Sequence, residues 1–321
     1  MRVFVTRELP GEGLQRLRAR PDLDVEVWSV DGPPPHDELL ARVRGVDGII
    51  CLITDRVDAQ VLDAAGPQLK VVSQVAVGVD NIDVATCGAR GIVVGHTPDV
   101  LTETTADLAF ALLLASARRI VEAADYVRAG QWQTWSPTTL AGADAHGATL
   151  GIVGLGAIGQ ALARRAAGFQ MQLLYWSRHE KPEIADTLGA RYRPLPDLLA
   201  ESDFVSIHAA LSPETHHLID ADALARMPAH AVLINSARGP LVDEEALIAA
   251  LRSGAIAGAA LDVTEQEPIA LDSPLLRMPN VIVLPHIGSA SLATRTRMAD
   301  LAVDNLLAGL RGAPLPHAIR S

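Results

Sequence analysis

The sequence predicts an α/β protein built on two doubly wound parallel sheets. Short apolar runs alternate with helix-like segments along the whole chain, a pattern typical of parallel sheets covered by helices. The chain has 321 residues, of which 49% are hydrophobic, so it is long for one core and apolar enough for two. A glycine-rich turn lies near the middle of the chain, so one α/β unit is expected to precede the unit that contains this turn.

Five strands are expected before that turn, in a region that ends at a proline. Helix-like segments over residues 14–20, 38–43 and 61–65 separate them. The sequence Thr97-Pro98-Asp99 breaks this pattern, because proline and a capping acid mark a boundary before a helix. The five predicted strands cover residues 3–6, 25–28, 48–51, 70–75 and 92–96.

The second half of the chain predicts a larger sheet. A long helix is expected over residues 101–128, followed by a loop over residues 131–147 and then the glycine-rich turn. The last helix-like stretch, residues 292–310, has no further strand of this sheet to reach and is expected to return to the first unit. The six predicted strands cover residues 150–153, 172–176, 204–208, 231–234, 258–263 and 281–284.

The glycine-rich turn has the flanks that a dinucleotide site requires. An apolar strand precedes it and a helix-like stretch follows it, and its glycines have the spacing G-x-G-x-x-G. Such a turn places an anionic pyrophosphate on the helix N-terminus, where N–H groups lack partners. The alternative is a glycine-rich turn of an ordinary α/β protein. The residues of the predicted contact are Gly154, Leu155, Gly156, Ala157, Ile158 and Gly159.

The residues after the next strand indicate which dinucleotide binds. An acid at this position usually accepts hydrogen bonds from the ribose hydroxyls of NAD, but here the strand ends in Ser177 and Arg178. A guanidinium and a hydroxyl suit a 2′-phosphate, so the sequence favours NADP(H), with NAD(H) as the second cofactor. The alternative is that Arg178 is a surface residue in a loop that tolerates either cofactor.

Composition excludes several classes of partner and site. The net charge of −11 argues against nucleic acid and anionic membranes, and the longest apolar stretch, residues 106–117, is shorter than a membrane span. Cys51 and Cys87 have neither metal-ligand spacing nor a disulfide framework, which suits a cytoplasmic protein without a metal site.

Three side chains follow three of the predicted strands. Arg238, Glu267 and His286 would supply a cation, a carboxylate and an imidazole at the edge where open α/β sheets bind ligands. Arg238 could hold a substrate carboxylate and polarise a keto oxygen, and His286 could deliver the proton that accompanies a hydride. Glu267 would fix the tautomer of the imidazole and favour its charged form.

Each of these three residues also has an ordinary interpretation. Arg238 could be an ion-paired loop residue, and Glu267 could belong to a solvated acidic turn. Most of the ten histidines are expected to be structural or solvated. The interpretation as a catalytic set rests on the three arriving together at strand ends.

Motifs across the chain resemble the D-isomer-specific 2-hydroxyacid dehydrogenases. They comprise residues 74–83 (QVAVGVDNID), the glycine-rich turn, residues 235–239 (NSARG), residues 261–263 with Glu267-Pro268, and residues 285–289 (PHIGS). Residues 97–102, 105–108 and 175–178 are most similar to the glyoxylate/hydroxypyruvate reductase branch. The resemblance implies NADPH-dependent reduction of glyoxylate or hydroxypyruvate to the 2-hydroxy acid, the D-isomer where a stereocentre forms, in a homodimer.

The resemblance also implies the domain division and the site residues. Residues 99–286 would form a Rossmann-like NAD(P)-binding domain, inserted into a flavodoxin-like substrate-binding domain of residues 1–98 and 287–321. Arg238 would bind the substrate carboxylate, with His286 as acid/base and Glu267 as its partner. The other substrate-binding residues would be Ile53, Val77, Gly78, Ser289 and, from the partner subunit's arm, a tryptophan at position 135 (Trp135). Beyond the glycine-rich turn, the cofactor would be lined by Thr105, Ser177, Arg178, His208, Pro213, Ala237, Asp262 and Gly288.

The sequence departs from the family at a few positions, and related proteins offer alternatives. Thr264 stands where the family often has an aromatic residue, and Val79 stands where many relatives have Tyr or Phe. Phosphonate dehydrogenases share the Trp-Ser-Pro arm at residues 135–137, but their substrate-binding lysine falls at Ala76. A further alternative from a different functional class is a nucleotide-sensing corepressor, which would keep the fold and the three residues without turnover.

Overall fold

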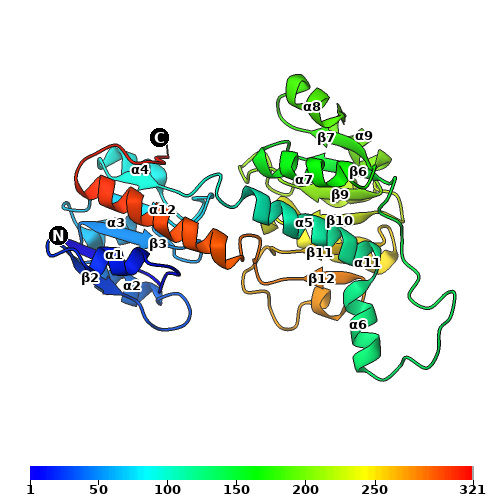
Figure 1. Ribbon diagram of the computed structural model, residues 1–321, viewed down its shortest axis with the longest axis horizontal. Helices are drawn as coiled ribbons and strands as arrows, with labels where there is room; N and C mark the ends of the chain where they lie inside the picture. The colour runs from blue at the N-terminus through cyan, green and yellow to red at the C-terminus, as the bar shows by residue number, and fades with distance from the viewer. Residues whose placement is uncertain (320–321) are drawn as a thin grey trace. The chain divides into compact units, whose positions relative to one another are not determined.

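The computed structural model describes residues 1–319 and divides into two compact units (Figure 1). The first unit comprises Met1–Leu101 and the chain from Ser289 onward, and the second comprises Thr102–Gly288. Each unit contains one sheet in which every strand pairing is parallel. The predicted fold class of two parallel-sheet α/β units is therefore confirmed.

The sheet of the first unit has the strand order β2-β1-β3-β4-β5. This is the order of flavodoxin-like folds, in which the chain winds first to one side of β1 and then to the other. All five predicted strands are present, whereas α4 was not expected from the sequence. The strands are β1 (Arg2–Val5), β2 (Asp24–Val27), β3 (Gly48–Cys51), β4 (Val71–Gln74) and β5 (Val93–Gly95), and the helices between them are α1 (Gly13–Arg18), α2 (His36–Arg42), α3 (Ala59–Ala65) and α4 (Val84–Ala89).

The last helix, α12 (Leu292–Leu310), covers one face of this first sheet. Its buried Val303 and Leu306 share an apolar cluster with Ile50 and Val71 of the sheet. A β-carbon at Gly309 would lie 2.6 Å from the β-carbon of Val71, so the glycine permits the close approach of helix and strand. The C-terminal helix therefore belongs to the unit that the N-terminus begins, as the sequence pattern indicates.

The sheet of the second unit has seven strands in the order β12-β11-β10-β9-β6-β7-β8. Strands β7 and β8 are added on one side of the first strand, β6, and the later strands on its other side, as in Rossmann folds. The sequence predicts six of these strands. The seventh, β8 (Ala190–Tyr192), is only three residues long and includes the exposed Arg191, so it lacks an apolar run. The other strands are β6 (Thr149–Val153), β7 (Gln172–Trp176), β9 (Phe204–Ile207), β10 (Val232–Asn235), β11 (Gly258–Leu261) and β12 (Val281–Val283).

Apolar residues cover both faces of this second sheet, because successive side chains of a strand point to opposite faces. Ile152 of β6 belongs to the cluster that includes Leu113, whereas the next residue, Val153, belongs to the cluster that includes Leu247. The helices of this unit are α5 (Thr102–Ala117), α6 (Ile120–Arg128), α7 (Ala157–Ala167), α8 (Pro182–Leu188), α9 (Leu195–Glu201), α10 (Ala221–Leu224) and α11 (Glu244–Ser253).

The single long helix expected over residues 101–128 is in fact two helices. The chain breaks at Arg119, whose φ of 50° lies in the left-handed region, and α6 begins immediately after it. Helix α5 is largely buried, whereas α6 has no buried residue. Within residues 1–319, no helix combines the length and the apolar character needed to cross a membrane.

Candidate active site

Three neighbouring strands of the second unit carry the predicted catalytic residues. Strands β10, β11 and β12 pair side by side in parallel, so their carboxyl ends meet at one edge of the sheet. Arg238 follows β10, Glu267 follows β11 and His286 follows β12. The topology thus brings to one edge three residues that are separated in the sequence.

His286 and Glu267 are in direct contact. The imidazole Nδ1 lies 2.7 Å from the carboxylate Oε2, and the other carboxylate oxygen accepts a hydrogen bond of 3.2 Å from the backbone N–H of Thr264. Because the carboxylate can only accept, Nδ1 is the protonated nitrogen of this pair. The His286 and Glu267 side chains are 28% and 35% exposed.

The backbone holds His286 in an unusual conformation. Its φ of 54° lies in the left-handed region, which a residue with a β-carbon adopts only when its surroundings impose it. The backbone N–H of His286 donates to the carbonyl of Asp262 at 2.9 Å, and the next N–H, from Ile287, donates to Asp262 Oδ1 at 2.7 Å. Asp262 therefore ties the histidine loop to the end of β11.

The loop that carries Arg238 packs against the loop that carries Glu267. The buried Asn235 shapes the first loop, since its Nδ2 donates to the carbonyl of Arg238 at 2.9 Å and its Oδ1 accepts from the N–H of Ala237 at 3.1 Å. A β-carbon at Gly239 would lie only 2.0 Å from the carbonyl oxygen of Thr264. Only glycine permits this approach, which brings the two loops into contact.

Asp262, Thr105 and Gly288 also gather at this edge. A β-carbon at Gly288 would lie 3.2 Å from Asp262 Oδ2 and 3.5 Å from Thr105 Oγ1. Asp262 is 1% exposed, and its Oδ2 has no hydrogen-bond partner among the described residues. Burial raises the pKa of Asp262. A buried acceptor of this kind fits a ligand that donates an N–H or O–H.

The glycine-rich turn has the form that a pyrophosphate requires. Gly154 has a φ of 104°, and a β-carbon there would lie 2.6 Å from the N atom of Ala209. A β-carbon at Gly159 would lie 2.2 Å from the carbonyl oxygen of Gly154, so this glycine lets α7 pack on the strand. A β-carbon at Gly156 would meet nothing within 4 Å, which leaves space for a ligand beside the first N–H groups of α7.

The non-glycine residues of the turn, Leu155, Ala157 and Ile158, differ in their exposure to solvent. Leu155 is fully buried, so only its backbone is available to a ligand. Ala157 is exposed and Ile158 is partly exposed at the start of α7. The turn thus presents backbone groups to a ligand, as an anion site at a helix N-terminus requires.

Ser177 and Arg178 follow β7, the neighbour of β6. Ser177 Oγ donates to the carbonyl of His179 at 2.5 Å, and the Arg178 side chain is exposed. Lys181, four residues after Ser177, donates from Nζ to the carbonyl of Leu155 at 3.0 Å. A second cation therefore lies directly beside the glycine-rich turn. The pKa of Glu214 is lowered, first by its hydrogen bond with Ser212 and to a smaller extent by the positive charge of Arg178.

His208 lies against the glycine-rich turn and is neutral near pH 7. Its N–H donates to the carbonyl of Val153 at 2.7 Å, and its Nε2 lies 2.8 Å from Ser206 Oγ. Burial lowers the pKa of His208 to about 4. The segment after it, which contains Pro213, is held by Thr215, whose Oγ1 donates to the carbonyl of Ala210 at 2.8 Å.

The predicted substrate residues of the first unit lie on two adjacent loops. Ile53 follows β3, and Val77 and Gly78 follow β4. Asn81 joins the loops, because its Nδ2 donates to the carbonyls of Leu52 and Asp55 at 3.0 and 2.7 Å. The sequence interpretation did not assign a role to this amide, although Asn81 belongs to the QVAVGVDNID motif.

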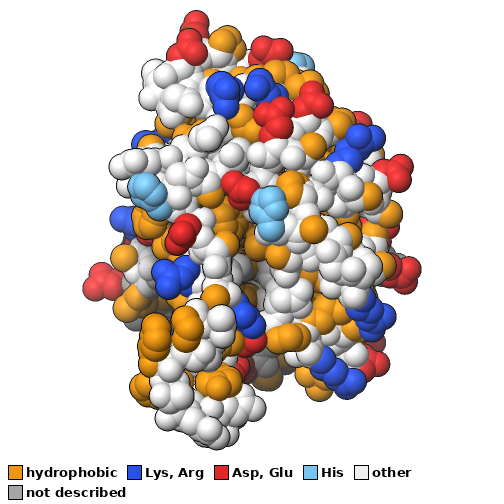
Figure 2. All heavy atoms as spheres, turned by 90° about the vertical axis from the view of Figure 1, so that its right-hand side faces the viewer, with side chains coloured by type: hydrophobic (Ala, Val, Ile, Leu, Met, Phe, Trp, Pro, Cys, Tyr) orange, Lys and Arg blue, Asp and Glu red, His pale blue; other side chains and the backbone are white. Residues whose placement is uncertain are grey.

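Exposed apolar side chains lie on α6 and on the loop that comes after it. Trp135 is 81% exposed, and the others in this segment are Ile120, Val121, Val127 and Trp132. In the face of the second unit shown in Figure 2, hydrophobic side chains gather toward the lower end. Whether Trp135 reaches a partner subunit's site stays a prediction. Ser289, the remaining predicted substrate residue, opens the segment that leads into α12.

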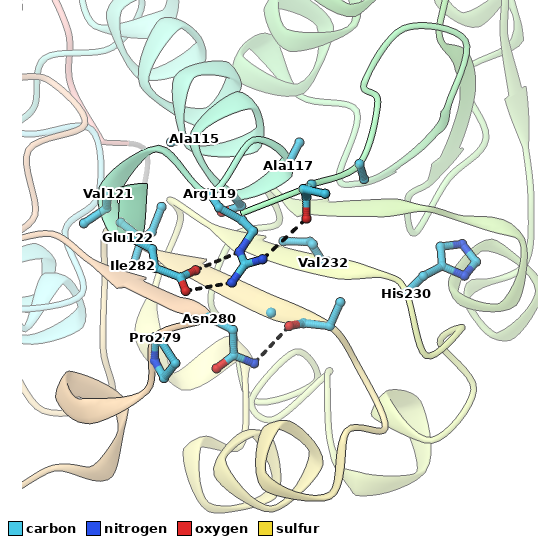
Figure 3. Close-up of a pocket in the computed structure, with 16 residues that line it drawn as sticks. Ala115, Ala117, Arg119, Val121, Glu122, His230, Val232, Pro279, Asn280 and Ile282 are labelled. Atoms are coloured by element: carbon cyan, nitrogen blue, oxygen red, sulfur yellow. Dashed lines mark hydrogen bonds and ion pairs between the residues drawn. The ribbon is translucent and has the colours of Figure 1, made fainter. Parts of the chain in front are cut away.

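A pocket at the opposite edge of the second sheet is a separate feature (Figure 3). Asn280 and Ala257 line it where they precede β12 and β11, and Asn280 Nδ2 donates to the carbonyl of Ala257 at 2.9 Å. Arg119 also lines it, and its guanidinium pairs with Glu122 at 2.7 and 2.8 Å. The pocket lies at the amino ends of the strands, so it is not the predicted active site.

Comparisons with known proteins identify the family. The model described as the D-isomer specific 2-hydroxyacid dehydrogenase NAD binding domain matches residues 110–288. A glyoxylate reductase from Korarchaeum cryptofilum is 50% identical, covering 99% of this chain and 95% of its own length. A human protein named glyoxylate reductase/hydroxypyruvate reductase is 47% identical, covering 100% of this chain and 98% of its own length.

Solved structures agree with these relatives. A Thermus thermophilus protein superposes with a TM-score of 0.94 at 51% identity, covering 100% of both chains. An NADPH-dependent glyoxylate/hydroxypyruvate reductase from Sinorhizobium meliloti, solved with NADP and malonate, has a TM-score of 0.85 at 36% identity, covering 99% of this chain and 96% of its own. The chain therefore belongs to the D-isomer-specific 2-hydroxyacid dehydrogenase family, and the matched segment is its NAD-binding domain.

Proposed function

We propose that this protein uses NADPH to reduce a small 2-oxo acid, glyoxylate or hydroxypyruvate, to the 2-hydroxy acid, with the D-isomer formed where the product has a stereocentre. The observation that carries the proposal is the 2.7 Å contact between His286 and Glu267 at strand ends beside the buried Asp262. An imidazole whose Nδ1 is held by a carboxylate is a suitable proton donor through Nε2. The relatives named as glyoxylate and hydroxypyruvate reductases support this substrate class.

Each of the three residues at this edge would have a separate role in the reaction. Arg238 would bind the substrate carboxylate through two parallel hydrogen bonds and polarise the keto oxygen. His286 would donate its Nε2 proton to that oxygen, and Glu267 would stabilise the imidazolium state from which the proton leaves. The bound nicotinamide supplies the hydride. Asp262 Oδ2, Thr105, Ala237 and Gly288 would contact the nicotinamide end of the cofactor.

The cofactor proposal rests on the end of β7. With Ser177 and Arg178 in place of an acid, and Lys181 beside the glycine-rich turn, this corner presents two cations to a 2′-phosphate. The Sinorhizobium relative described above was solved with NADP, which supports the same preference. NAD(H) would be the second, weaker cofactor.

We further propose that the first unit binds substrate and that the protein is a homodimer. The substrate-binding domain would comprise residues 1–98 and 287–321, and the nucleotide domain residues 99–286. The N–H groups of Val77 and Gly78 would hold the substrate carboxylate, with Ile53 and Ser289 nearby. Exposed apolar residues along α6 and the loop after it, with Trp135 among them, support a dimer that uses this segment.

A panel of 2-oxo acids measured with both cofactors tests the proposal. We expect the highest kcat/KM with glyoxylate or hydroxypyruvate and NADPH, and a lower value with NADH. Preferred oxidation of phosphite would indicate a phosphonate dehydrogenase instead. Tight NADPH binding without turnover of any 2-oxo acid would indicate a nucleotide-sensing protein and overturn the proposal.

A further inference from the structure

Three successive peptide groups of the loop after β4 are held by their carbonyl oxygens. The carbonyl of Ala76 accepts from the backbone N–H of Thr97 at 2.8 Å. The carbonyl of Val77 accepts from His96 Nδ1 at 2.9 Å, and the carbonyl of Gly78 accepts from Gln74 Nε2 at 3.3 Å. Two of the three donors are side chains, so the arrangement depends on residue identity at positions 74 and 96.

These contacts fix the direction of the N–H groups in the same loop. In a trans peptide group, the N–H points away from the C=O of the preceding residue. The peptide whose oxygen Thr97 holds carries the N–H of Val77, and the peptide whose oxygen His96 holds carries the N–H of Gly78. Both N–H groups therefore point away from the donors that anchor the loop.

The amide of Gln74 is itself held in place. Gln74 is fully buried, and its Oε1 accepts from Cys51 Sγ at 3.1 Å. Its Nε2 also donates to Asn81 Oδ1 at 2.7 Å, and Asn81 is the residue that joins this loop to the loop of Ile53. With both ends of its amide engaged, Gln74 presents a fixed donor to Gly78.

His96 occupies a different position, at the surface end of β5. Because the carbonyl of Val77 can only accept, Nδ1 is the protonated nitrogen in this contact. The backbone of His96 is anchored as well, since Asn305 Nδ2 of α12 donates to its carbonyl at 2.9 Å. The sequence alone indicates only a structural or solvated histidine here.

We infer that His96 and Gln74 are positioning residues for substrate, which hold the loop of Val77 and Gly78 for the carboxylate of the 2-oxo acid. His96 orients the peptide that carries the N–H of Gly78, and Gln74 holds the next peptide, at the carbonyl of Gly78. The inference rests on the proposed function, in which the N–H groups of Val77 and Gly78 bind that carboxylate. Neither side chain needs to touch the substrate. A carboxylate contact of this kind is the same in the ground state and the transition state, so its loss should raise KM more than it lowers kcat.

The pair His96→Phe and His96→Asn tests the histidine. Phenylalanine keeps the ring and removes the donor, whereas asparagine places an N–H at the same distance from the backbone as Nδ1. For His96→Phe we expect KM for glyoxylate to rise by about tenfold, the loss expected for a weakened charge-assisted hydrogen bond, with kcat within about twofold of wild type. His96→Asn should restore KM to within about threefold of wild type.

Gln74→Met, compared with Ser73→Ala, tests the glutamine. Methionine keeps the length of the side chain but cannot donate to Gly78. Ser73 precedes Gln74 on β4, is equally buried and donates from Oγ to the carbonyl of Ala302 at 2.8 Å, so its loss also removes one buried hydrogen bond. We expect Gln74→Met to raise KM for glyoxylate by about tenfold and Ser73→Ala to leave it unchanged, with equal NADPH affinity in both.

The possible outcomes separate this inference from the proposed function. A wild-type protein without 2-oxo acid turnover would overturn the proposed function, and the inference with it. Normal turnover with an unchanged KM in His96→Phe would overturn the inference alone. Equal loss in His96→Phe and His96→Asn, or an equal rise of KM in Gln74→Met and Ser73→Ala, would also overturn it, because a purely structural role predicts no such distinction.

Discussion

The two sheets of this protein present different kinds of chemical group at their carboxyl ends. In the second unit the loops after β10, β11 and β12 carry ionisable side chains: Arg238, Glu267 and His286. In the first unit the loop after β4 carries peptide groups, which buried and surface side chains hold by their carbonyl oxygens. The difference shows that the carboxyl edge of a parallel sheet can present either ionisable side chains or oriented peptide groups. In the proposed function the first edge serves chemistry and the second serves recognition.

The largest expected effect is that of a substitution at the carboxyl edge of the second sheet. His286→Ala should lower kcat by about 10²–10⁴-fold, since it removes the proposed proton donor, while NADPH affinity should stay unchanged. Steady-state kinetics and a cofactor titration check this. Glu267→Gln is the matched control, because it keeps a hydrogen-bonding side chain beside Nδ1 but removes the charge, and it should give an intermediate kcat. A normal kcat in the His286→Ala enzyme would show that His286 is not the proton donor.

A pair of glycine substitutions separates packing from ligand space within the glycine-rich turn. Gly159→Ala should lower the free energy of unfolding by about 1–3 kcal/mol, because its β-carbon would overlap the carbonyl of Gly154. Gly156→Ala should leave the free energy of unfolding almost unchanged but weaken NADPH binding, since its β-carbon would enter the space beside α7.

Denaturant unfolding and NADPH titration of both variants check this difference. Wild-type affinity for NADPH in Gly156→Ala would show that the open space is not used by the cofactor. An unchanged unfolding free energy in Gly159→Ala would contradict the packing assignment.

Arg178→Ala should change cofactor preference rather than chemistry. We expect kcat/KM for NADPH to fall by about tenfold, because one charge-assisted contact to the 2′-phosphate is lost, and kcat/KM for NADH to stay constant. Arg193→Ala is the control, since Arg193 is another cation of the second unit but pairs with Glu201 at 3.2 Å. An NADPH/NADH ratio that does not move in Arg178→Ala would remove the basis for the NADP(H) preference.

The last expected effect concerns stability against pH. Because burial lowers the pKa of folded His208 to about 4, the unfolded chain takes up this proton first as the pH falls below about 6.5. The free energy of unfolding should therefore decrease between about pH 6.5 and 4, by roughly 2–3 kcal/mol from this residue. Denaturant titrations of wild type and His208→Asn at pH 7.5 and 5.5 check this, and the variant should lose less stability on acidification.

The sequence predicts the strand-end side chains of the second unit better than the oriented peptide groups of the first unit, for a physical reason. Buried strands are apolar runs, so the residues after them, such as Arg238 after β10, are recognisable as strand-end residues. Strand β8 was missed because exposed Arg191 interrupts its short run, and the break at Arg119 was missed because arginine carries no helix-breaking signal. The direction of the peptide groups around Val77 depends on a contact from His96, which no local pattern encodes.

The close approach of Gly239 to the carbonyl of Thr264 limits how this family member can diverge. A β-carbon at this position would overlap the backbone of Thr264 and Glu265, so any larger residue would push apart the loops of Arg238 and Glu267. Mutational paths to a new substrate should therefore pass through the surrounding pocket, or through paired changes in both loops. In a saturation library at position 239, glycine should be the residue that survives selection for function.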